Sequence, residues 1–408
     1  MAVDFWQGKK LVVAVSGGIA AYKSLELIRR LRELGCCLLG VVVTPAALQF
    51  VTPLSLTALS EAPLYDDLFS LTQEREMGHI RLAREADLLI VAPATADLMA
   101  RMAQGLGDDL LTTLLLARRG PVLLAPAMNS AMWLHPATQR NVAQLREDGI
   151  HMVGPASGSL ACGEVGPGRM AEAEAIIEAA QGVLTPQRLA GRRILITAGP
   201  TREAVDPVRF ISNRSSGRMG FAIAAAAQRM GAQVTLVHGP CGIPPPRGVL
   251  PVAVESAEQM LAAVQVAWPQ SDAAIMSAAV SDYRPLQVAP QKLKKEAQGG
   301  QQIQWSLTEN PDILAYAGAN KQPGQWLVGF AAETEKLLQH GTEKRRRKGC
   351  DLLVVNDVSR QDIGFDATHN EVMVLGPGED AVESWARCRK DEIAQQLMER
   401  LAACMETA

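Results

Sequence analysis

The sequence predicts an α/β protein made of two doubly wound domains in tandem, and three observations support this. Short apolar runs recur without polar alternation, which is typical of strands buried on both faces of a parallel sheet. Helical spacing separates the runs, as at Leu25, Ile28 and Leu31, and Gly35 then ends that helix. A strand leading into a glycine-containing loop occurs twice, in LVVAVSGGIA and in ILITAGPT. The expected strands cover residues 11–15, 88–92, 122–125, 194–198, 234–237, 327–330 and 352–355.

The chain length and one connecting segment predict where the two domains meet. With 408 residues, the chain exceeds the size at which a single hydrophobic core stops growing. Residues 182–193 carry Pro186, Gly191 and several basic side chains, and a new strand follows at once. We therefore expect one domain over residues 1–190 and a second over residues 191–408.

The composition excludes several classes of protein. A net charge of −3 argues against a general nucleic-acid binder, which carries a basic excess. The seven cysteines are odd in number and form no C-x-x-C, so neither a disulfide framework nor a thiolate zinc site is expected. No apolar run has the length of a membrane span, and the first eight residues do not resemble a signal peptide. A reducing cytoplasm is the expected location.

Two loops of the first half follow predicted strands, at the edge of an open sheet where ligands bind. The loop Ser16-Gly17-Gly18-Ile19-Ala20 suits a phosphate at a helix N-terminus, although a tight turn alone also requires glycine. It lacks the G-x-G-x-x-G spacing of a dinucleotide site, which leaves a mononucleotide open. The second loop reads APATAD and can equally be an ordinary polar loop.

Three further segments carry chemically capable side chains. His79 is a lone histidine that can act as an acid or base or bind a carboxylate, although such histidines are usually structural. Asn129 can orient a carboxylate, whereas the neighbouring Met128 and Met132 suggest packing. Cys162 lies in the glycine-rich ACGEVGPGRM, a candidate lid in which an exposed thiol can donate a proton.

Taken together and in this order, SGGIAAYK, His79, APATAD, PAMNSAM and ACGEVGPGRM resemble the flavin-containing cysteine decarboxylases over about residues 9–180. The resemblance implies a flavodoxin-like FMN domain that decarboxylates 4'-phosphopantothenoylcysteine. It implies that His79 is the base or positions the carboxylate, that Asn129 holds the carboxylate, and that Cys162 donates a proton. It also implies substrate contacts from Met128 and Met132. The FMN contacts that it implies are Gly17, Gly18, Ile19, Ala20, Thr44, Ala94, Thr95 and Ala96.

The second half contains features that favour an anionic ligand. Ser215, Ser216 and Gly217 precede an Ala-rich helix expected over residues 221–230, where they can simply cap it, but Arg and Asn are dense nearby. The run KRRRK is the strongest charge cluster in the chain. On a helix, Lys344 and Lys348 stand four residues apart on one face, so we expect both to reach one phosphate and the arginines between them to be solvated.

The set TAGPTRE, DPVRFISNRSSGRMG, AAVSDYRP, KLKK, NPDI, GFAAET and VVNDV resembles the 4'-phosphopantothenate–cysteine ligases. The resemblance implies a mostly parallel sheet, CTP as co-substrate and Mg²⁺ bridging its phosphates, with metal ligands unknown. It implies that Arg209 and Asn213 hold an acyl-cytidylate and that Lys292 supports its formation. The implied CTP contacts are Asp282, Lys292, Asn310, Pro311, Asp312, Ile313, Phe330, Lys344 and Lys348. Residues after about 381 carry little of this resemblance.

Three alternatives stay open from the sequence. One is an NAD(P)-dependent oxidoreductase, another is a non-enzymatic regulator on the flavin fold, and the third is a chain in which only one half is active. The resemblance further implies homo-oligomers, in which flavin domains form trimers that join into a dodecamer and ligase domains form dimers. The partners it implies are otherwise the small molecules 4'-phosphopantothenate, L-cysteine and CTP.

Overall fold

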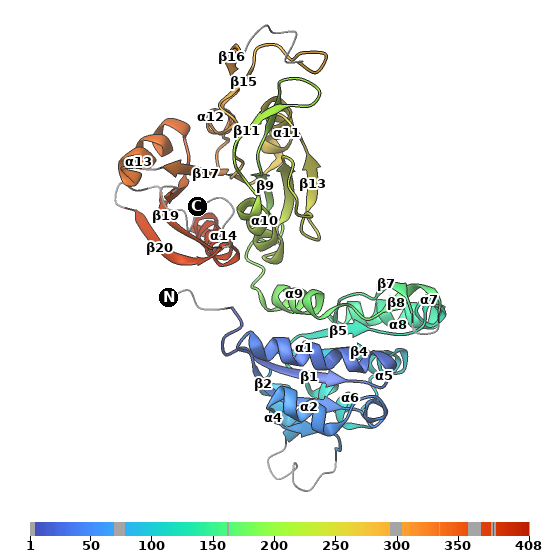
Figure 1. The fold of residues 1–408 in the computed structure, drawn as a ribbon. Helices are drawn as coiled ribbons and strands as arrows, with labels where there is room; N and C mark the ends of the chain where they lie inside the picture. The colour runs from blue at the N-terminus through green and yellow to red at the C-terminus, as the bar shows by residue number, and fades with distance from the viewer. Residues whose placement is uncertain are drawn as a thin grey trace. The chain divides into compact units, whose positions relative to one another are not determined.

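The computed structural model describes residues 5–68, 78–160, 163–293, 304–333, 335–357, 369–376, 378 and 381–407, with side chains at all of these except 78, 79 and 357. The chain divides into two compact units between Pro186 and Gln187 (Figure 1). We call them the N-terminal unit and the C-terminal unit and describe each by itself. None of the helices described is long and apolar enough to cross a membrane.

The N-terminal unit contains a six-stranded parallel sheet in the order β3-β2-β1-β4-β5-β6. Without the two-residue edge strand β3, this is the flavodoxin-like order, and β3 extends it to the Rossmann order. The order reverses between β1 and β4, which marks the expected ligand-binding edge. The strands are β1 Lys10–Val15, β2 Cys37–Val43, β3 Leu64–Tyr65, β4 Leu88–Ala94, β5 Val122–Pro126 and β6 His151–Met152.

Helices cover both faces of this sheet. Along β1, Leu11 and Val13 belong to one buried cluster, while Val12 and Ala14 belong to another. Both faces of the sheet are therefore buried at this strand. Helices α1, α2 and α9 contribute to the first cluster, and α4, α5, α6 and α8 to the second. The helices are α1 Tyr22–Glu33, α2 Pro53–Ser60, α4 Gly78–Glu85, α5 Ala96–Ala103, α6 Leu110–Ala117, α7 Ser130–Leu134, α8 Pro136–Glu147 and α9 Ala173–Leu184, with 3-10 turns η1 Ile19–Ala21 and η2 Ala47–Gln49.

The C-terminal unit contains an eight-stranded sheet in the order β13-β12-β9-β14-β17-β18-β19-β20. The pairs from β13 to β18 are parallel, whereas β19 and β20 are added antiparallel. The continuous apolar runs of both halves therefore form strands as the sequence predicted. The strands are β9 Arg193–Ala198, β12 Gln233–His238, β13 Leu250–Ala253, β14 Ala273–Met276, β17 Trp326–Glu333, β18 Leu352–Asp357, β19 His369–Leu375 and β20 Val382–Arg389.

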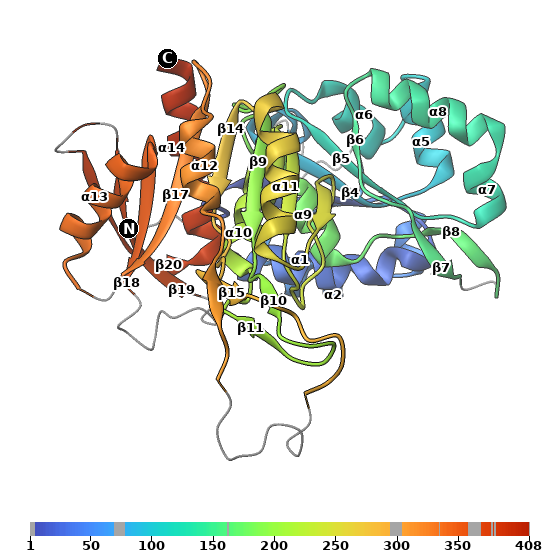
Figure 2. The ribbon, with the colours of Figure 1, turned by 90° about the horizontal axis from the view of Figure 1, so that it is seen from above.

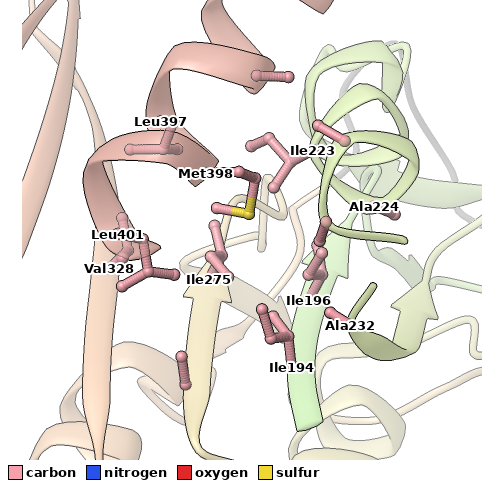
Figure 3. Close-up of a cluster of buried hydrophobic side chains, with 14 of the residues drawn as sticks. Ile194, Ile196, Ile223, Ala224, Ala232, Ile275, Val328, Leu397, Met398 and Leu401 are labelled. Carbon is pink, nitrogen blue, oxygen red and sulfur yellow. The ribbon is translucent and has the colours of Figure 1, made fainter. Parts of the chain in front are cut away.

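The helices of the C-terminal unit are also divided between two faces. Helices α10 and α14 pack together on one face, where Ile223 and Ala224 meet Leu397, Met398 and the strand side chains (Figure 3). Helices α11 and α12 contribute to the buried cluster on the other face. The bounds are α10 Arg218–Arg229, α11 Ala257–Ala267, α12 Ile313–Ala319, α13 Leu337–Lys348 and α14 Lys390–Thr407, with the turn η3 Trp268–Gln270.

Among the described residues, three short antiparallel strand pairs lie outside the large sheets, and we call them hairpins. In the N-terminal unit, β7 Ala156–Ser159 pairs with β8 Val165–Arg169. In the C-terminal unit, β10 Arg202–Ala204 pairs with β11 Phe210–Ser212, and β15 Tyr283–Pro285 pairs with β16 Leu307–Glu309. Strands β10 and β15 lie side by side, so the two hairpins adjoin (Figure 2).

Candidate active sites

A cavity of about 1020 Å³ opens at the carboxyl ends of the strands in the N-terminal unit. Loops after β1, β2, β4 and β5 form its wall, together with the β7–β8 hairpin, so it lies across the point where the strand order reverses. Of the residues proposed from the sequence for FMN and substrate, those that line it are Gly17, Gly18, Ile19, Ala20, Thr44, Thr95, Ala96, Met128, Asn129 and Met132.

Hydrogen bonds fix the floor of this cavity. Ser16 Oγ is buried, donates to the Pro93 carbonyl at 2.8 Å and accepts from the Thr95 amide at 3.2 Å, which ties the loop after β1 to the loop after β4. Gly17 packs so closely that a Cβ there would lie 2.4 Å from the Cβ of Ala46. Glycine is therefore required at this position by packing as well as by any approach of a ligand.

Two threonines on the cavity wall also shape the local backbone. Thr95 Oγ1 accepts from the Leu98 amide at 3.3 Å and caps α5, while Thr44 Oγ1 accepts from the Ala47 amide at 3.2 Å. Their hydroxyl protons stay available to a phosphate or a polar ring. Ala94, which the resemblance implied as an FMN contact, is fully buried inside β4 and packs in the core behind the wall.

Asn129 occupies a defined position between a helix and a hairpin. Its Oδ1 caps α7 by accepting from the Ala131 amide at 2.7 Å, and its Nδ2 donates to Glu164 Oε2 at 2.7 Å. The hairpin lies close to this segment, because Met128 N donates to the Gly168 carbonyl at 2.9 Å and a Cβ on Gly168 would lie 2.2 Å from Met128 O. Glu164 stands within the quoted ACGEVGPGRM, but sequence reasoning gave it no role.

Two cationic side chains on the same cavity wall were also not identified as site residues from the sequence. Lys23 Nζ pairs with Glu172 at 3.0 Å, and Arg169 bonds the same carboxylate. The lysine first, and then the arginine, holds the pKa of Glu172 below its ordinary value. Nothing in the spacing of these residues along the chain predicted that they would meet.

The side chains of two proposed catalytic residues are not among those that the structure describes. Cys162 lies outside the described residues, and His79 is described only by its backbone, in the first turn of α4. Their roles therefore stay as implied by the sequence.

The C-terminal unit has its own cavity, of about 590 Å³, at the carboxyl ends of β14, β17 and β18. Four of the proposed residues meet in its wall, namely Asn213, Asp282, Phe330 and Lys344. Asn213 Nδ2 donates to the Val280 carbonyl at 2.8 Å, which fixes the loop before α10 against the loop after β14. Ala278, Ala279 and Val280 complete that part of the wall.

Arg209 and Lys292 do not line this cavity. Asp206 accepts from Arg209 Nε at 2.9 Å and Nη2 at 2.6 Å, and also from the Leu293 amide at 3.2 Å. Arg209 Nη2 donates in turn to the Leu293 carbonyl at 2.7 Å. The pair therefore binds the exposed Lys292 segment to the β10–β11 hairpin. Chiefly because of Arg209, the pKa of Asp206 is held well below its usual range.

The start of α12 lies next to the cavity rather than in its wall. Asn310 Nδ2 donates to the Ser281 carbonyl at 2.8 Å, and its amide donates to the Asp282 carbonyl at 2.8 Å. Asp312 caps the helix by accepting from the Ala315 amide at 2.8 Å, and it also pairs with Lys348. The helix begins at Ile313, directly after this cap.

The structure corrects two expectations about this unit. Arg345 is not solvated, because it is 9% exposed and faces β18, where its Nη1 lies 3.5 Å from the Asp351 carbonyl. The helix expected over residues 221–230 begins earlier, as α10, with Gly217 as its N-cap in the left-handed region and no side-chain cap. Ser215 and Ser216 instead stand on the cavity wall.

Three further cavity residues come from distant parts of the chain. Asn356, at the end of β18, stands within the quoted VVNDV but was given no role from the sequence, whereas Asn370 in β19 and Lys390 at the start of α14 were not singled out at all. Across the part of the chain that the structure describes, no group of three or more His, Cys, Asp or Glu side chains is arranged to hold a metal ion.

Comparison with known proteins identifies two family models along the chain. Residues 6–185 match the family described as flavoprotein, and residues 189–405 match the DNA/pantothenate metabolism flavoprotein C-terminal domain. The flavoprotein model covers nearly all of the N-terminal unit, and the second model covers nearly all of the C-terminal unit.

Curated relatives match both halves at once. The coenzyme A biosynthesis bifunctional protein CoaBC of Vibrio vulnificus strain YJ016 is 48% identical over 376 residues, covering 92% of this chain and 93% of the relative. The protein of the same name from Escherichia coli strain K12 is 47% identical over 395 residues, covering 97% of each chain.

Solved structures match the halves separately. The C-terminal domain of a coenzyme A biosynthesis bifunctional protein CoaBC is 38% identical, covers 54% of this chain and 100% of its own, and has a TM-score of 0.46. The FMN-binding protein AtHal3 is 36% identical, covers 43% of this chain and 96% of its own, and has a TM-score of 0.39. From the full-length relatives and the two family models, this chain belongs to the family of bifunctional coenzyme A biosynthesis proteins.

Proposed function

We propose that the chain catalyses two consecutive steps of coenzyme A biosynthesis. The C-terminal unit condenses 4'-phosphopantothenate with L-cysteine at the expense of CTP, and the N-terminal unit decarboxylates the resulting 4'-phosphopantothenoylcysteine to 4'-phosphopantetheine. One observation carries the proposal. Each unit has a cavity at the carboxyl end of its parallel sheet, and residues of that unit's own motif set line it.

The N-terminal cavity fits FMN in size and in chemistry. Its volume is at the upper limit of the range of cofactor sites, and two glycines offer backbone amides next to the hydroxyls of Thr44 and Thr95. The bound flavin supplies the two-electron oxidation and re-reduction of substrate that makes loss of CO₂ feasible. Apolar Ile19 and Met132 on the cavity wall would exclude water from the flavin.

The residues of this unit place the substrate and move its protons. The Asn129 amide holds the substrate carboxylate through Nδ2, and the side chains of Met128 and Met132 pack on the substrate. His79 is the base or positions the carboxylate, and Cys162 returns a proton from the ACGEVGPGRM loop, which acts as a lid. We carry these two roles over from the family motifs.

The C-terminal unit activates a carboxylate and then transfers it. An oxygen of the 4'-phosphopantothenate carboxylate attacks the α-phosphorus of CTP and releases pyrophosphate, which leaves an acyl-cytidylate. The cysteine amine attacks the acyl carbon, releases CMP and loses a proton. Asp282, Phe330 and Lys344 bind the nucleotide, and Asn213 holds the intermediate. Such a step depends on positioning and charge neutralisation. Mg²⁺ bound with the nucleotide would supply part of that neutralisation.

Residues outside the wall complete this proposal. Arg209 and Lys292 act on the intermediate from the β10–β11 hairpin and from the segment that Asp206 and Arg209 hold to it through the Leu293 backbone. Asn310, Pro311, Asp312 and Ile313 support the nucleotide from the start of α12, and Lys348 completes the lysine pair when it leaves Asp312 for a phosphate.

Assembly and location are further parts of the proposal. We propose a cytoplasmic homo-oligomer, in which flavin units form trimers within a dodecamer and ligase units form dimers. The odd number of cysteines supports a reducing compartment. Mass photometry of the purified full chain measures the number of subunits.

A coupled assay tests both activities in one sample. Purified full-length protein receives 4'-phosphopantothenate, L-cysteine, CTP and Mg²⁺, and pyrophosphate and CO₂ are followed together. We expect both products from the wild type, loss of CO₂ alone from His79→Asn, and loss of both from Lys292→Gln. Supplying 4'-phosphopantothenoylcysteine directly restores CO₂ release to Lys292→Gln and serves as its control.

The outcomes separate this proposal from its alternatives. Pyrophosphate without CO₂ leaves a ligase whose flavin unit is silent. Folded, FMN-loaded protein that makes neither product contradicts the biosynthetic function and favours a regulatory one. If the purified protein contains a nicotinamide cofactor instead of a yellow flavin, the result supports an NAD(P)-dependent oxidoreductase.

A further inference from the structure

Arg284 joins three neighbouring segments of the C-terminal unit. It lies in β15, directly after the loop that carries Asp282, and its side chain is 29% exposed. Its Nη1 donates to the Glu309 carbonyl at 2.7 Å and to Asn310 Oδ1 at 3.2 Å. Its Nη2 pairs with Glu258 of α11 at 3.0 Å. One guanidinium group therefore connects the end of β16, the segment that follows β16, and α11.

The segment that follows β16 is the part of the chain that the proposed function places against CTP. We call residues 310–313 the nucleotide segment. The amide of Asn310 donates to the Asp282 carbonyl, and its Nδ2 donates to the Ser281 carbonyl, both at 2.8 Å. Its Oδ1 accepts from Arg284. Both polar atoms of the Asn310 side chain therefore have partners in the protein and hold the segment to the loop after β14.

The nucleotide segment offers its backbone rather than its side chains to a ligand. Asp312 is engaged through both carboxylate oxygens, because Oδ1 caps α12 and Oδ2 pairs with Lys348. In contrast, no hydrogen bond from another described residue reaches the carbonyl oxygen of Asn310 or of Pro311. A backbone carbonyl is placed only by the fold around it, so ligand binding through this segment depends on how firmly the segment is held.

Arg284 can hold the segment while the nucleotide is bound. In the proposed reaction, Lys348 leaves Asp312 for a phosphate, so the ion pair at that end of the segment is given up. Arg284 does not line the cavity of the C-terminal unit, and its bonds do not compete with a ligand there. It lines instead a separate hollow of about 540 Å³ between α11 and the β15–β16 hairpin.

We propose that Arg284 is a positioning residue for CTP binding. It does not touch the nucleotide, but it fixes the nucleotide segment through the Glu309 carbonyl and Asn310 Oδ1. The guanidinium group suits this role, because it is always charged and presents several donors in one rigid plane. The inference deepens the proposed function and rests on it for the identity of the ligand.

The test compares Arg284→Gln with Arg284→Lys, Glu258→Gln and Arg188→Gln in the full chain. Arg188 is the matched control, because its side chain is 34% exposed, pairs with Glu406 at 2.6 Å and stands outside the cavity wall of the same unit. CTP binding is measured by calorimetry. Pyrophosphate release gives kcat and the KM values for CTP and for 4'-phosphopantothenate. Thermal unfolding and decarboxylation of supplied 4'-phosphopantothenoylcysteine check folding.

We expect Arg284→Gln to raise the Kd and the KM for CTP about three- to tenfold, because hydrogen bonds from a charged donor are lost. The kcat and the KM for 4'-phosphopantothenate should stay within about twofold of the wild type. Arg284→Lys keeps the charge but not the planar fork, so its KM for CTP should be intermediate. Glu258→Gln and Arg188→Gln should resemble the wild type, because they remove only exposed ion pairs.

The opposite results are equally defined. A folded Arg284→Gln protein with the Kd and KM for CTP of the wild type overturns the positioning role and leaves the proposed function standing. An equal rise in both KM values also overturns it, because Arg284 then supports the unit as a whole. If Arg284→Gln does not fold, a wild-type KM for CTP in Arg284→Lys overturns the role instead.

Failure of the proposed function gives a different result. In that case the wild type makes no pyrophosphate from 4'-phosphopantothenate, L-cysteine and CTP. If the same protein still binds CTP in the calorimeter and Arg284→Gln weakens that binding, the ligase activity is overturned and the positioning role of Arg284 stands.

Discussion

Asn129 Nδ2 donates to Glu164 Oε2 at 2.7 Å, and this bond joins the start of α7 to the β7–β8 hairpin. A carboxylate only accepts hydrogen bonds, so Glu164 fixes which end of the Asn129 amide faces it. Because Asn129 Oδ1 is already used to cap α7, the whole side chain is oriented by its neighbours. This arrangement leads to the first prediction.

Replacing Glu164 with alanine should lower the rate of decarboxylation about three- to tenfold, because the amide of Asn129 loses its orienting partner. Glu164→Gln, which retains an acceptor oxygen, should recover part of the rate. CO₂ release from supplied 4'-phosphopantothenoylcysteine measures the effect. An unchanged CO₂ rate in Glu164→Ala would show that the hairpin bond has no part in the reaction.

Replacing Gly17 with valine should abolish flavin binding, since even a Cβ at this position would lie 2.4 Å from the Cβ of Ala46. The loops after β1 and β2 must then separate. The matched control is Gly182→Ala in α9, where a new Cβ would meet nothing within 4 Å. Absorbance of the purified variants near the flavin bands is the measurement, and a fully yellow Gly17→Val protein contradicts the packing argument.

Asp206→Asn should destabilise the C-terminal unit in a pH-dependent manner. Because Arg209 depresses the pKa of Asp206 in the folded state, the pair stabilises the fold above the unfolded pKa of about 4. That contribution is lost as pH falls through the folded pKa. The wild type should therefore be more stable than the variant at pH 7, and the gap should narrow below about pH 4.

Thermal unfolding of the two proteins across this pH range measures the effect. Glu258→Gln provides the control, because Glu258 forms an exposed pair with Arg284 and should change stability little at any pH. If the difference in unfolding temperature between Asp206→Asn and the wild type stays constant down to pH 2, Asp206 stabilises the unit through packing rather than through its charge.

Buried thiols should resist alkylation in the native protein. Burial, with a smaller effect of Asp351, raises the pKa of Cys350 to about 12, and burial raises that of Cys388 to about 11. Cys37 is exposed. Iodoacetamide at pH 8 should therefore label Cys37 and spare Cys350 and Cys388 until denaturant is added, because the thiolate is the reactive form. Mass spectrometry of the peptides measures labelling, and rapid native labelling of Cys350 contradicts the prediction.

The sequence alone predicted seven of the strands and the loops that follow them, whereas β2, β13, β19 and β20 were not among the apolar runs that it singled out. Continuous apolar runs such as those of β4 and β9 can only be buried on both faces, so they had to lie inside parallel sheets covered by helices. Because parallel strands end at one edge of the sheet, the motif loops that follow them lie together at that edge. Gly17, Thr95 and Asn129 share a cavity for this reason.

Tertiary structure decided which side chains meet. Lys390 follows an antiparallel strand and lies far along the chain from the loop before α10, so no local pattern could place them in one cavity. Arg345 looked like part of a solvated charge run, yet one face of α13 is pressed against β18 and buries it. Arg209 pairs with Asp206 and does not line the cavity. Periodicity fixes which residues can be buried, but partners separated by long stretches of chain are chosen only when the sheets and helices pack.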